Sequence, residues 1–428
     1  MSNYKSFIHF GCWNYKKCDS SNLAEPVNTE DTNITRVMKT LKKYVETSRP
    51  MPEFLTVAGD NYYFVKNKKE GVEEDEKIFN PEFLLSGFNC LPKDIKKYVL
   101  IGNHDLENIE NPLKDPDCRI LEIQQDFASD GTNNMVLESD RKGPIMHNVL
   151  DESTIVIMLD TTMYETSEKS IKKVMKCYQR MFEMNELDVP ENVVLEKIKV
   201  MRENQKQRLD QYISSLNAET IKNIIVVGHH PLFDLKTKKD DETGKIKTKE
   251  EVMPLLNDLY YESIYAPLQS GNPEINYFYL CADLHQYQTG TVTIQPQSMP
   301  SLVIQQYIVG TGGTELEKKR YDHSKDDGVS FTNEKYSINY DIIPNATEYT
   351  HGFLVCKLDT DKNFSAEFIP ADSPESVGGT SYKKKRKTMK RKTMKRATRK
   401  ATRKVKRFTK KLLKHKKGLK HRKTKKRK

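Results

Sequence analysis

Five short segments of the chain carry side chains of the kinds that bind metal ions and transfer protons. Each segment begins with glycine or alanine directly after an apolar run. They are Gly11-Cys12-Trp13-Asn14, Gly59-Asp60-Asn61-Tyr62-Tyr63, Gly102-Asn103-His104-Asp105, Gly228-His229-His230-Pro231 and Ala282-Asp283-Leu284-His285. Glycine permits tight turns that aim the next side chain at a shared point. Carboxylates and imidazoles that converge at one point suit ions such as Fe, Mn or Zn, so the ordered set predicts a metal site.

Apolar runs of strand length must position these side chains. The predicted strands are residues 7–10, 54–57, 98–101, 154–159, 223–227, 277–281, 303–309 and 353–358. Helical spacing of apolar residues predicts helices over 34–46, 167–186 and 192–216. Strands that alternate with helices indicate a layered α/β domain, in which ligand sites form at the carboxyl ends of strands. Two segments are interpreted as insertions: a charged loop over 236–252 and the helical stretch between 164 and 205.

The charge is divided unevenly along the chain. Residues 383–428 hold 28 of the 71 Lys and Arg residues and no acidic residue. The preceding 382 residues therefore carry 43 basic and 60 acidic side chains, a net charge of −17. This division predicts a folded acidic domain over 1–372, a linker over 373–382 and a disordered basic tail over 383–428.

The seven cysteines are odd in number and scattered, and none forms a CxxC pair. This pattern is typical of reduced thiols in an intracellular protein. The N-terminus shows no secretory signal, and no apolar run approaches the ~20 residues that cross a bilayer. We therefore expect an intracellular protein, cytoplasmic or nuclear, in a host cell or virion if its source is viral.

In order and composition, the five segments resemble the motifs of the calcineurin-like metallophosphoesterase superfamily. They are most similar to those of the purple (tartrate-resistant type) acid phosphatases. That family reads GDWG, GDNFY, GNHD, GHYP and GHDH where this chain reads GCWN, GDNYY, GNHD, GHHP and ADLH. The resemblance covers roughly residues 5–370 and excludes the tail. It implies a four-layer α/β/β/α sandwich, with two mixed sheets flanked by helices.

The resemblance also implies metal-ligand roles. Asp60 would bridge two metal ions, Tyr63 and His285 would bind the first ion, and Asn103 and His229 would bind the second. The ions would be divalent or trivalent, Fe together with Zn or Mn, and they would assist hydrolysis of phosphomonoesters.

Three further residues are candidates for contact with the substrate or its neighbours. His104 would bind the phosphate or protonate the leaving oxygen, and Asp105 would orient His104. His230 would either line the substrate pocket or pack in the interior.

Two ligand positions depart from the family pattern. Cys12 replaces an aspartate, and it is open to two interpretations: a thiolate ligand that favours Zn or ferrous iron, or a buried small apolar residue. Asp283 replaces a histidine of the second site and would be a harder ligand. Asn14 stands where the wider superfamily has a histidine, and its amide oxygen is a further candidate ligand.

Two functions from different classes follow. One is a metal-dependent phosphoesterase that acts on a phosphorylated substrate. The other is a catalytically impaired relative that binds nucleic acid or another polyanion through its basic tail, because dense positive charge binds phosphates with little sequence choice.

Overall fold

The computed structural model describes residues 4–67, 76–107, 118–137, 145–165, 177–178, 190–239, 246–269, 271–272, 274–297, 299–316, 329–343 and 350–372. The chain divides into two units, Met1–Asp372 and Ser373–Lys428. The predicted linker 373–382 and the predicted disordered tail 383–428 lie outside the described residues.

The first sheet of the domain has six strands in the order β18-β17-β1-β2-β5-β6. Their bounds are β1 Lys5–Phe10, β2 Phe54–Ala58, β5 Lys96–Leu100, β6 Met135–Leu137, β17 Gly352–Leu358 and β18 Phe364–Pro370. The four strands from β1 to β6 are parallel, whereas β17 and β18 run antiparallel to their neighbours. The sheet is therefore mixed, and the parallel strands place their carboxyl ends at one edge.

The second sheet has eight strands in the order β15-β16-β13-β14-β12-β9-β8-β7. Their bounds are β7 Ile145–Asp151, β8 Thr154–Leu159, β9 Asn223–Val227, β12 Asn276–Cys281, β13 Tyr287–Pro296, β14 Leu302–Val309, β15 Val329–Thr332 and β16 Tyr336–Ile342. Strands β8, β9, β12 and β14 are parallel. Every residue of β8 and β9 is buried, as is typical of parallel strands that are covered on both faces.

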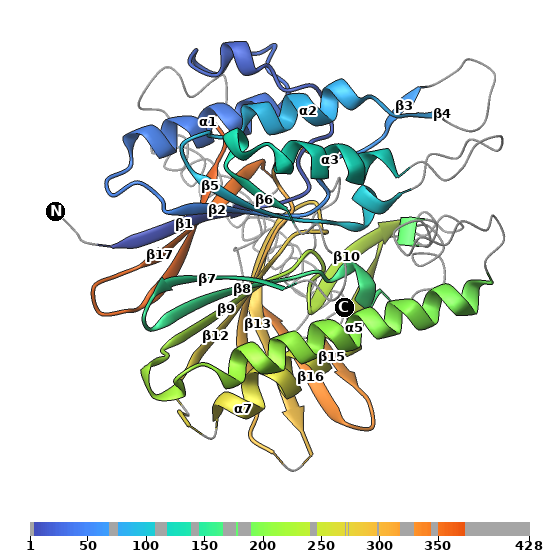
Figure 1. The fold of residues 1–428 in the computed structure, drawn as a ribbon, viewed down its shortest axis with the longest axis vertical. Coiled ribbons are helices and arrows are strands. Elements are labelled where there is room, and N and C mark those ends of the chain that lie inside the picture. Colours follow the sequence, from blue (N-terminus) through green and yellow to red (C-terminus); the bar gives the residue numbers. More distant parts are fainter. Residues whose placement is uncertain are drawn as a thin grey trace, which may run out of the picture. The chain divides into compact units, whose positions relative to one another are not determined.

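Helices cover the outer faces of both sheets (Figure 1). The helices α1 Asn33–Thr47, α2 Pro81–Cys90 and α3 Arg119–Ser129 lie over the first sheet. Helix α5 (Glu191–Ser214) and helix α7 (Ala266–Gln269) lie over the second. A helix α6 (Pro254–Leu259) leads through a π-helical turn (Tyr260–Tyr265) into α7. The predicted α/β/β/α sandwich with two mixed sheets is confirmed.

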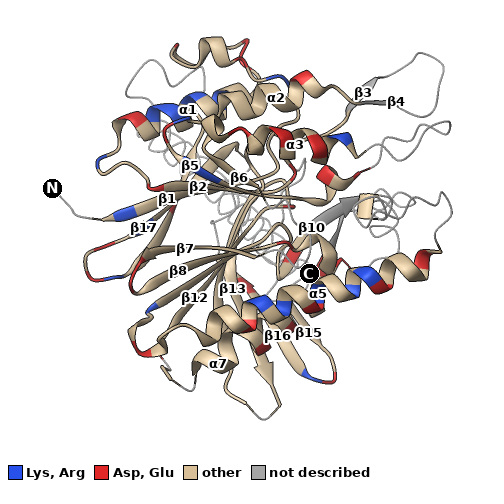
Figure 2. Ribbon diagram, in the orientation of Figure 1, with Lys and Arg blue, Asp and Glu red and all other residues tan. Residues whose placement is uncertain are grey.

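Charged residues lie mostly on the helices and on the turns between strands, while the two sheets carry few of them (Figure 2). Helix α1 illustrates why the charged residues lie on the outside, because its apolar face packs inward. Its apolar residues Val37, Met38, Leu41 and Val45 repeat at helical spacing and are buried. Thr32 caps the helix by accepting a hydrogen bond from the backbone N–H of Thr35.

All eight predicted strands are present within about two residues of their predicted bounds. The predicted helix over 34–46 corresponds to α1, and the one over 192–216 corresponds to α5. Of the helix predicted over 167–186, only the helical residues Cys177 and Tyr178 lie within the described part of the chain.

The prediction of a charged loop over 236–252 is wrong for the described residues. Strands β10 (Phe233–Lys239) and β11 (Ile246–Val252) pair as an antiparallel ribbon. The two strands hydrogen-bond each other's backbone N–H and C=O groups, so a strand forms here although the segment is polar. The sequence pattern did not reveal it because few residues in the segment are apolar. A second small ribbon joins β3 (Val65–Asn67) and β4 (Glu76–Ile78).

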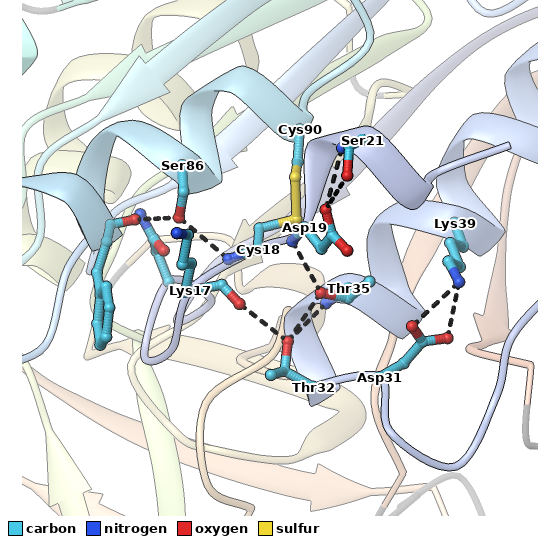
Figure 3. The surroundings of a disulfide bond; sticks show 12 residues. Lys17, Cys18, Asp19, Ser21, Asp31, Thr32, Thr35, Lys39, Ser86 and Cys90 are labelled. Atoms are coloured by element: carbon cyan, nitrogen blue, oxygen red, sulfur yellow. Dashed lines mark hydrogen bonds and ion pairs between the residues drawn. A yellow bond between two sulfur atoms is a disulfide. The ribbon is translucent and has the colours of Figure 1, made fainter. Parts of the chain in front are cut away.

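The prediction that the cysteines are reduced is also wrong for four of them. Cys18 is bonded to Cys90, with Cα atoms 6.5 Å apart, and Cys118 is bonded to Cys177, with Cα atoms 5.5 Å apart. The partners are 72 and 59 residues apart in sequence, so no local spacing indicates the pairing. Figure 3 shows the first bond, which joins the segment after β1 to the last turn of α2.

The other three cysteines, Cys12, Cys281 and Cys356, are free and buried.

Within the described part of the chain, no helix combines the length and apolar character needed to cross a membrane.

Candidate metal centre

Three residues at the ends of three strands adopt a backbone conformation that side chains rarely tolerate. Cys12 follows β1 with φ 51°, Asp60 follows β2 with φ 52°, and Asp283 follows β12 with φ 52°. Left-handed backbone costs a residue other than glycine about 1–2 kcal/mol. Such strain concentrates at functional sites, where it aims side chains that a relaxed turn would direct elsewhere.

Glycine is required at position 102, where the loop after β5 meets the loops after β2 and β9. A Cβ atom on Gly102 would lie 2.2 Å from Asp60 Oδ1 and 2.8 Å from His229 Cε1. Any larger residue would therefore displace the two side chains. The glycine that opens the Asn103 segment lets the loops after β2, β5 and β9 approach within contact distance.

The buried carboxylate of Asp60 faces a different set of groups with each oxygen. Oδ1 accepts a hydrogen bond from the backbone N–H of His104 at 3.0 Å and lies 3.3 Å from His229 Nε2. Oδ2 accepts from the Tyr63 hydroxyl at 2.8 Å and lies 3.8 Å from Cys12 Sγ. Burial raises the pKa of Asp60, but the nearby imidazoles of His229 and His104 outweigh burial, and the pKa is lowered. Asp60 is thus an anion with two separate coordination faces.

The first donor set surrounds Asp60 Oδ2. The Tyr63 hydroxyl oxygen lies 3.1 Å from His285 Nε2. Ligand atoms of Cys12, Asp60 and His285 all lie within 4.8 Å of one another. Burial, followed by the charge of Asp60, raises the pKa of the Cys12 thiol and of the Tyr63 phenol well above their usual values. A bound cation would reverse this effect, because a thiol or phenol that coordinates a metal ion releases its proton to solvent and binds as the anion.

The second donor set surrounds His229 Nε2. This atom lies 3.2 Å from Asn103 Oδ1, 3.3 Å from Asp60 Oδ1 and 3.8 Å from Asp283 Oδ1. Because His229 Nδ1 donates to the carbonyl oxygen of Ala58 at 2.6 Å, the ring presents a lone pair at Nε2 when it is neutral, which is the form that binds a metal ion. That lone pair faces three oxygens that also present lone pairs. Four converging electron-rich atoms are stabilised by a cation between them, so the residues fit a metal ion.

His104 and Asp105 occupy different environments. The side chain of His104 is 30% exposed, its Nδ1 lies 3.3 Å from Glu107 Oε1, and its ring packs on Tyr63 with centroids 4.6 Å apart. Glu107 thus places a carboxylate at His104 Nδ1, whereas the sequence predicted Asp105 as the residue that orients His104.

Asp105 is buried and organises the backbone of the site. Its carboxylate accepts hydrogen bonds from the N–H of Gly102 at 2.8 Å, the N–H of Asn61 at 3.0 Å and Gln124 Nε2 at 2.9 Å. Burial, followed by the charge of Asp60, raises the pKa of Asp105 to about 7, although the N–H donors oppose this rise. Asp105 thus ties the loop after β2 to the loop after β5.

The structure places Asn14 away from these two sets and His230 beside the second one. The buried amide of Asn14 donates from Nδ2 to the carbonyl oxygen of Leu84 in α2 at 2.9 Å. Among its hydrogen bonds, none joins Asn14 to Cys12, Asp60 or His285. His230 is buried beside the second set, and a nitrogen of its ring lies within 4.8 Å of the ligand atoms of His229 and Asp283.

Sequence reasoning missed several residues that support the site. Glu107 stands one helical turn after His104, and this i, i+3 spacing was a usable signal. Gln124 and Asn61 hold Asp105, and the Thr161 hydroxyl accepts from the backbone N–H groups of His229 and His230. Gln124 and Thr161 follow no metal-binding motif, so only the fold brings them to the site.

A comparison with protein families identifies one match. The profile of the calcineurin-like phosphoesterase family matches residues 5–262, a segment that holds four of the five motifs. No curated protein matches the chain.

Proposed function

The chain belongs to the calcineurin-like phosphoesterase family, and from this premise we propose that it hydrolyses phosphomonoesters with two metal ions. The ions would be held where β1, β2, β5, β9 and β12 end. When bound, they would supply positive charge that stabilises the phosphoryl oxygens and activates a water molecule.

The observation that carries this proposal is the pair of donor sets on the two oxygens of Asp60. Cys12, Tyr63 and His285 would hold one ion with Asp60 Oδ2. Four residues would hold the second ion. They are Asp60 through Oδ1, His229 through Nε2, and Asn103 and Asp283 through their side-chain oxygens.

The donor types support a mixed pair of ions. Cys12 and His285 provide sulfur and nitrogen for a borderline ion such as Zn or Fe, while Asp283 adds an oxygen that suits Mn or Fe. A tyrosinate ligand on ferric iron absorbs visible light, as the purple acid phosphatases do. An iron-loaded protein should therefore show a visible band that disappears in Tyr63→Phe.

His104 is the group that can serve the leaving oxygen. Its ring is partly open to solvent, and Tyr63 packs against one face of it. Glu107, which is only 5% exposed, places Oε1 3.3 Å from Nδ1 of this ring. A carboxylate on one ring nitrogen favours proton donation from the other nitrogen to a developing negative charge.

Metal analysis combined with hydrolysis of an aryl phosphate tests the proposal. We expect two ions per chain in the purified protein and turnover with at least one of Fe, Mn and Zn. Asp60→Asn should bind less than one ion and lose turnover, because amide substitution removes the charge shared by both sites. Fewer than one ion per chain in the natural protein, with no turnover across the three metals, would contradict the enzyme interpretation.

The double variant Cys12→Asp with Asp283→His restores the family pattern. It separates an impaired site from a scaffold that cannot bind metal.

We also propose that the basic tail binds polyanions such as nucleic acid. The supporting observation is its composition, with 28 Lys and Arg in residues 383–428 and no acidic residue. Such charge density binds phosphate backbones in a strongly salt-dependent way.

A further inference from the structure

The imidazole of His230 is a buried polar group that the proposed mechanism does not yet use. It follows the candidate ligand His229, and its side chain is 3% exposed. Nδ1 lies 3.1 Å from the hydroxyl oxygen of Thr161. Nε2 has no hydrogen-bond partner among the described residues, and Glu165 Oε1 lies 3.6 Å from it.

The Thr161 hydroxyl determines which nitrogen of His230 carries the proton. Its oxygen accepts hydrogen bonds from the backbone N–H of His229 and from the backbone N–H of His230, both at 3.0 Å. These two bonds occupy both acceptor positions of a hydroxyl oxygen. In its third bond the hydroxyl group must therefore act as the donor, and His230 Nδ1 is the acceptor. Since Nδ1 accepts, a neutral His230 ring carries its proton on Nε2.

A ring in this tautomer is a donor rather than a metal ligand. A nitrogen of His230 lies within 4.8 Å of ligand atoms of His229 and Asp283, so distance alone would admit His230 as a third ligand. The N–H at Nε2 excludes coordination through that atom. A buried donor without a partner costs about 1–3 kcal/mol, and a bound ligand with an acceptor oxygen would recover this energy.

Two acidic side chains near His230 are partly exposed. The side chains of Asp283 and Glu165 are each 18% exposed, in contrast to the buried His229. The Nε2–H group thus lies beside the second donor set and near two acidic residues whose side chains are partly exposed.

We propose that the Nε2–H of His230 donates a hydrogen bond to a phosphoryl oxygen of the bound phosphate ester. His230 is then a substrate-binding residue, and Thr161 is a positioning residue that fixes its tautomer. This inference rests on the proposed phosphoesterase function.

Binding of inorganic phosphate to the zinc-loaded full-length protein tests the inference by calorimetry. His230→Phe removes the donor but keeps a ring, and we expect phosphate affinity to fall about tenfold, as one lost hydrogen bond implies. His230→Gln places an amide N–H near the position of Nε2 and should stay within about threefold of the natural protein. Both variants should retain the zinc content of the natural protein. Unchanged phosphate affinity in His230→Phe would overturn the proposal, and so would a loss of zinc in this variant, which would make His230 a ligand. A natural protein that binds no metal would instead contradict the proposed function itself.

A second measurement reads the tautomer directly. Nitrogen NMR of the zinc-loaded protein with labelled histidine, with the His230 signals identified by their absence in His230→Phe, should show the proton on Nε2. Thr161→Ser keeps the hydroxyl and should preserve this signal pattern, whereas Thr161→Val should lose it. A proton on Nδ1 of His230 in the natural protein would refute the assignment.

Discussion

At the scale of single residues, backbone strain marks the site as clearly as side-chain chemistry does. Among the described residues, five that are not glycine have a positive φ, and three of them are Cys12, Asp60 and Asp283. Of the other two, Asn134 ends a 3-10 helix (Gly131–Asn133) and Lys362 lies in the connection between β17 and β18. A cysteine that served only to fill space would gain nothing from a strained backbone. The shared conformation therefore supports the interpretation of Cys12 as a ligand over its interpretation as a packing residue.

A buried histidine outside the metal centre gives the domain a specific acid sensitivity. His9 lies on β1, with Nδ1 2.9 Å from the Thr56 hydroxyl and Nε2 3.3 Å from the carbonyl oxygen of Cys281. Burial lowers its pKa to about 4, although the bond to Cys281 opposes this. Below pH ~6.5 His9 binds a proton in the unfolded chain but stays neutral in the folded protein. The free energy of unfolding therefore falls as the pH drops from ~6.5 to 4, and His9 does not affect it above this range.

Substitution of His9 should remove that sensitivity. In urea unfolding, the natural protein should lose about 2 kcal/mol more than His9→Gln when the pH changes from 7 to 5. Glutamine can still donate to Cys281, so its stability at pH 7 serves as the control. Equal losses in the two proteins would show that His9 does not govern the acid response.

At the scale of elements, helix α2 and the loop after β1 fit together at a glycine. A Cβ atom on Gly87 would lie 2.3 Å from Asn14 Nδ2 and 2.4 Å from its Cγ. The Asn14 amide is fully buried and bonded to Leu84, so it has no low-energy position to move to. The predicted ligand role of Asn14 thus competes with an observed role in packing this loop on α2.

Gly87→Ala should therefore destabilise the domain, although alanine favours helices over glycine by about 1 kcal/mol. We expect the free energy of unfolding to fall by about 1–3 kcal/mol, the usual cost of overpacking. Gly131→Ala is the matched control, because a Cβ atom there meets nothing within 4 Å. A more stable Gly87→Ala variant would mean that Asn14 can move away at little cost.

Some strands and site contacts could be predicted from the sequence, and others could not. Strands such as β8 and β9 are apolar at nearly every position, and this pattern located them and the motifs that follow them. Strand β18 alternates between partly buried and exposed positions, and β13 contains Gln, Thr and Gly, so neither stands out as an apolar run. The partners of Asp105 come from α3 and from the loop after β2, and only tertiary packing brings them together.

At the scale of the whole molecule, two disulfides change the interpretation of the cysteines. Disulfides form in oxidising compartments, so the thiol argument for an intracellular location no longer holds. Thiol titration of the denatured, unreduced protein should find three groups per chain, those of Cys12, Cys281 and Cys356. Seven groups would show that the pairs are reduced in the purified protein.

The net charge of the molecule also conceals two opposite parts. The formal charge of +11 combines a net −17 over residues 1–382 with +28 over residues 383–428. If the tail binds polyanions, the full chain should bind a DNA duplex at low salt and lose about a thousandfold or more in affinity between 50 and 200 mM salt, as release of several counterions requires. A chain that ends at residue 382 should not bind at any of these concentrations, because its net charge repels DNA. Fluorescence anisotropy of both chains across the salt series measures this. Equal binding by the two chains would assign nucleic-acid binding to the folded domain and remove the tail as its cause.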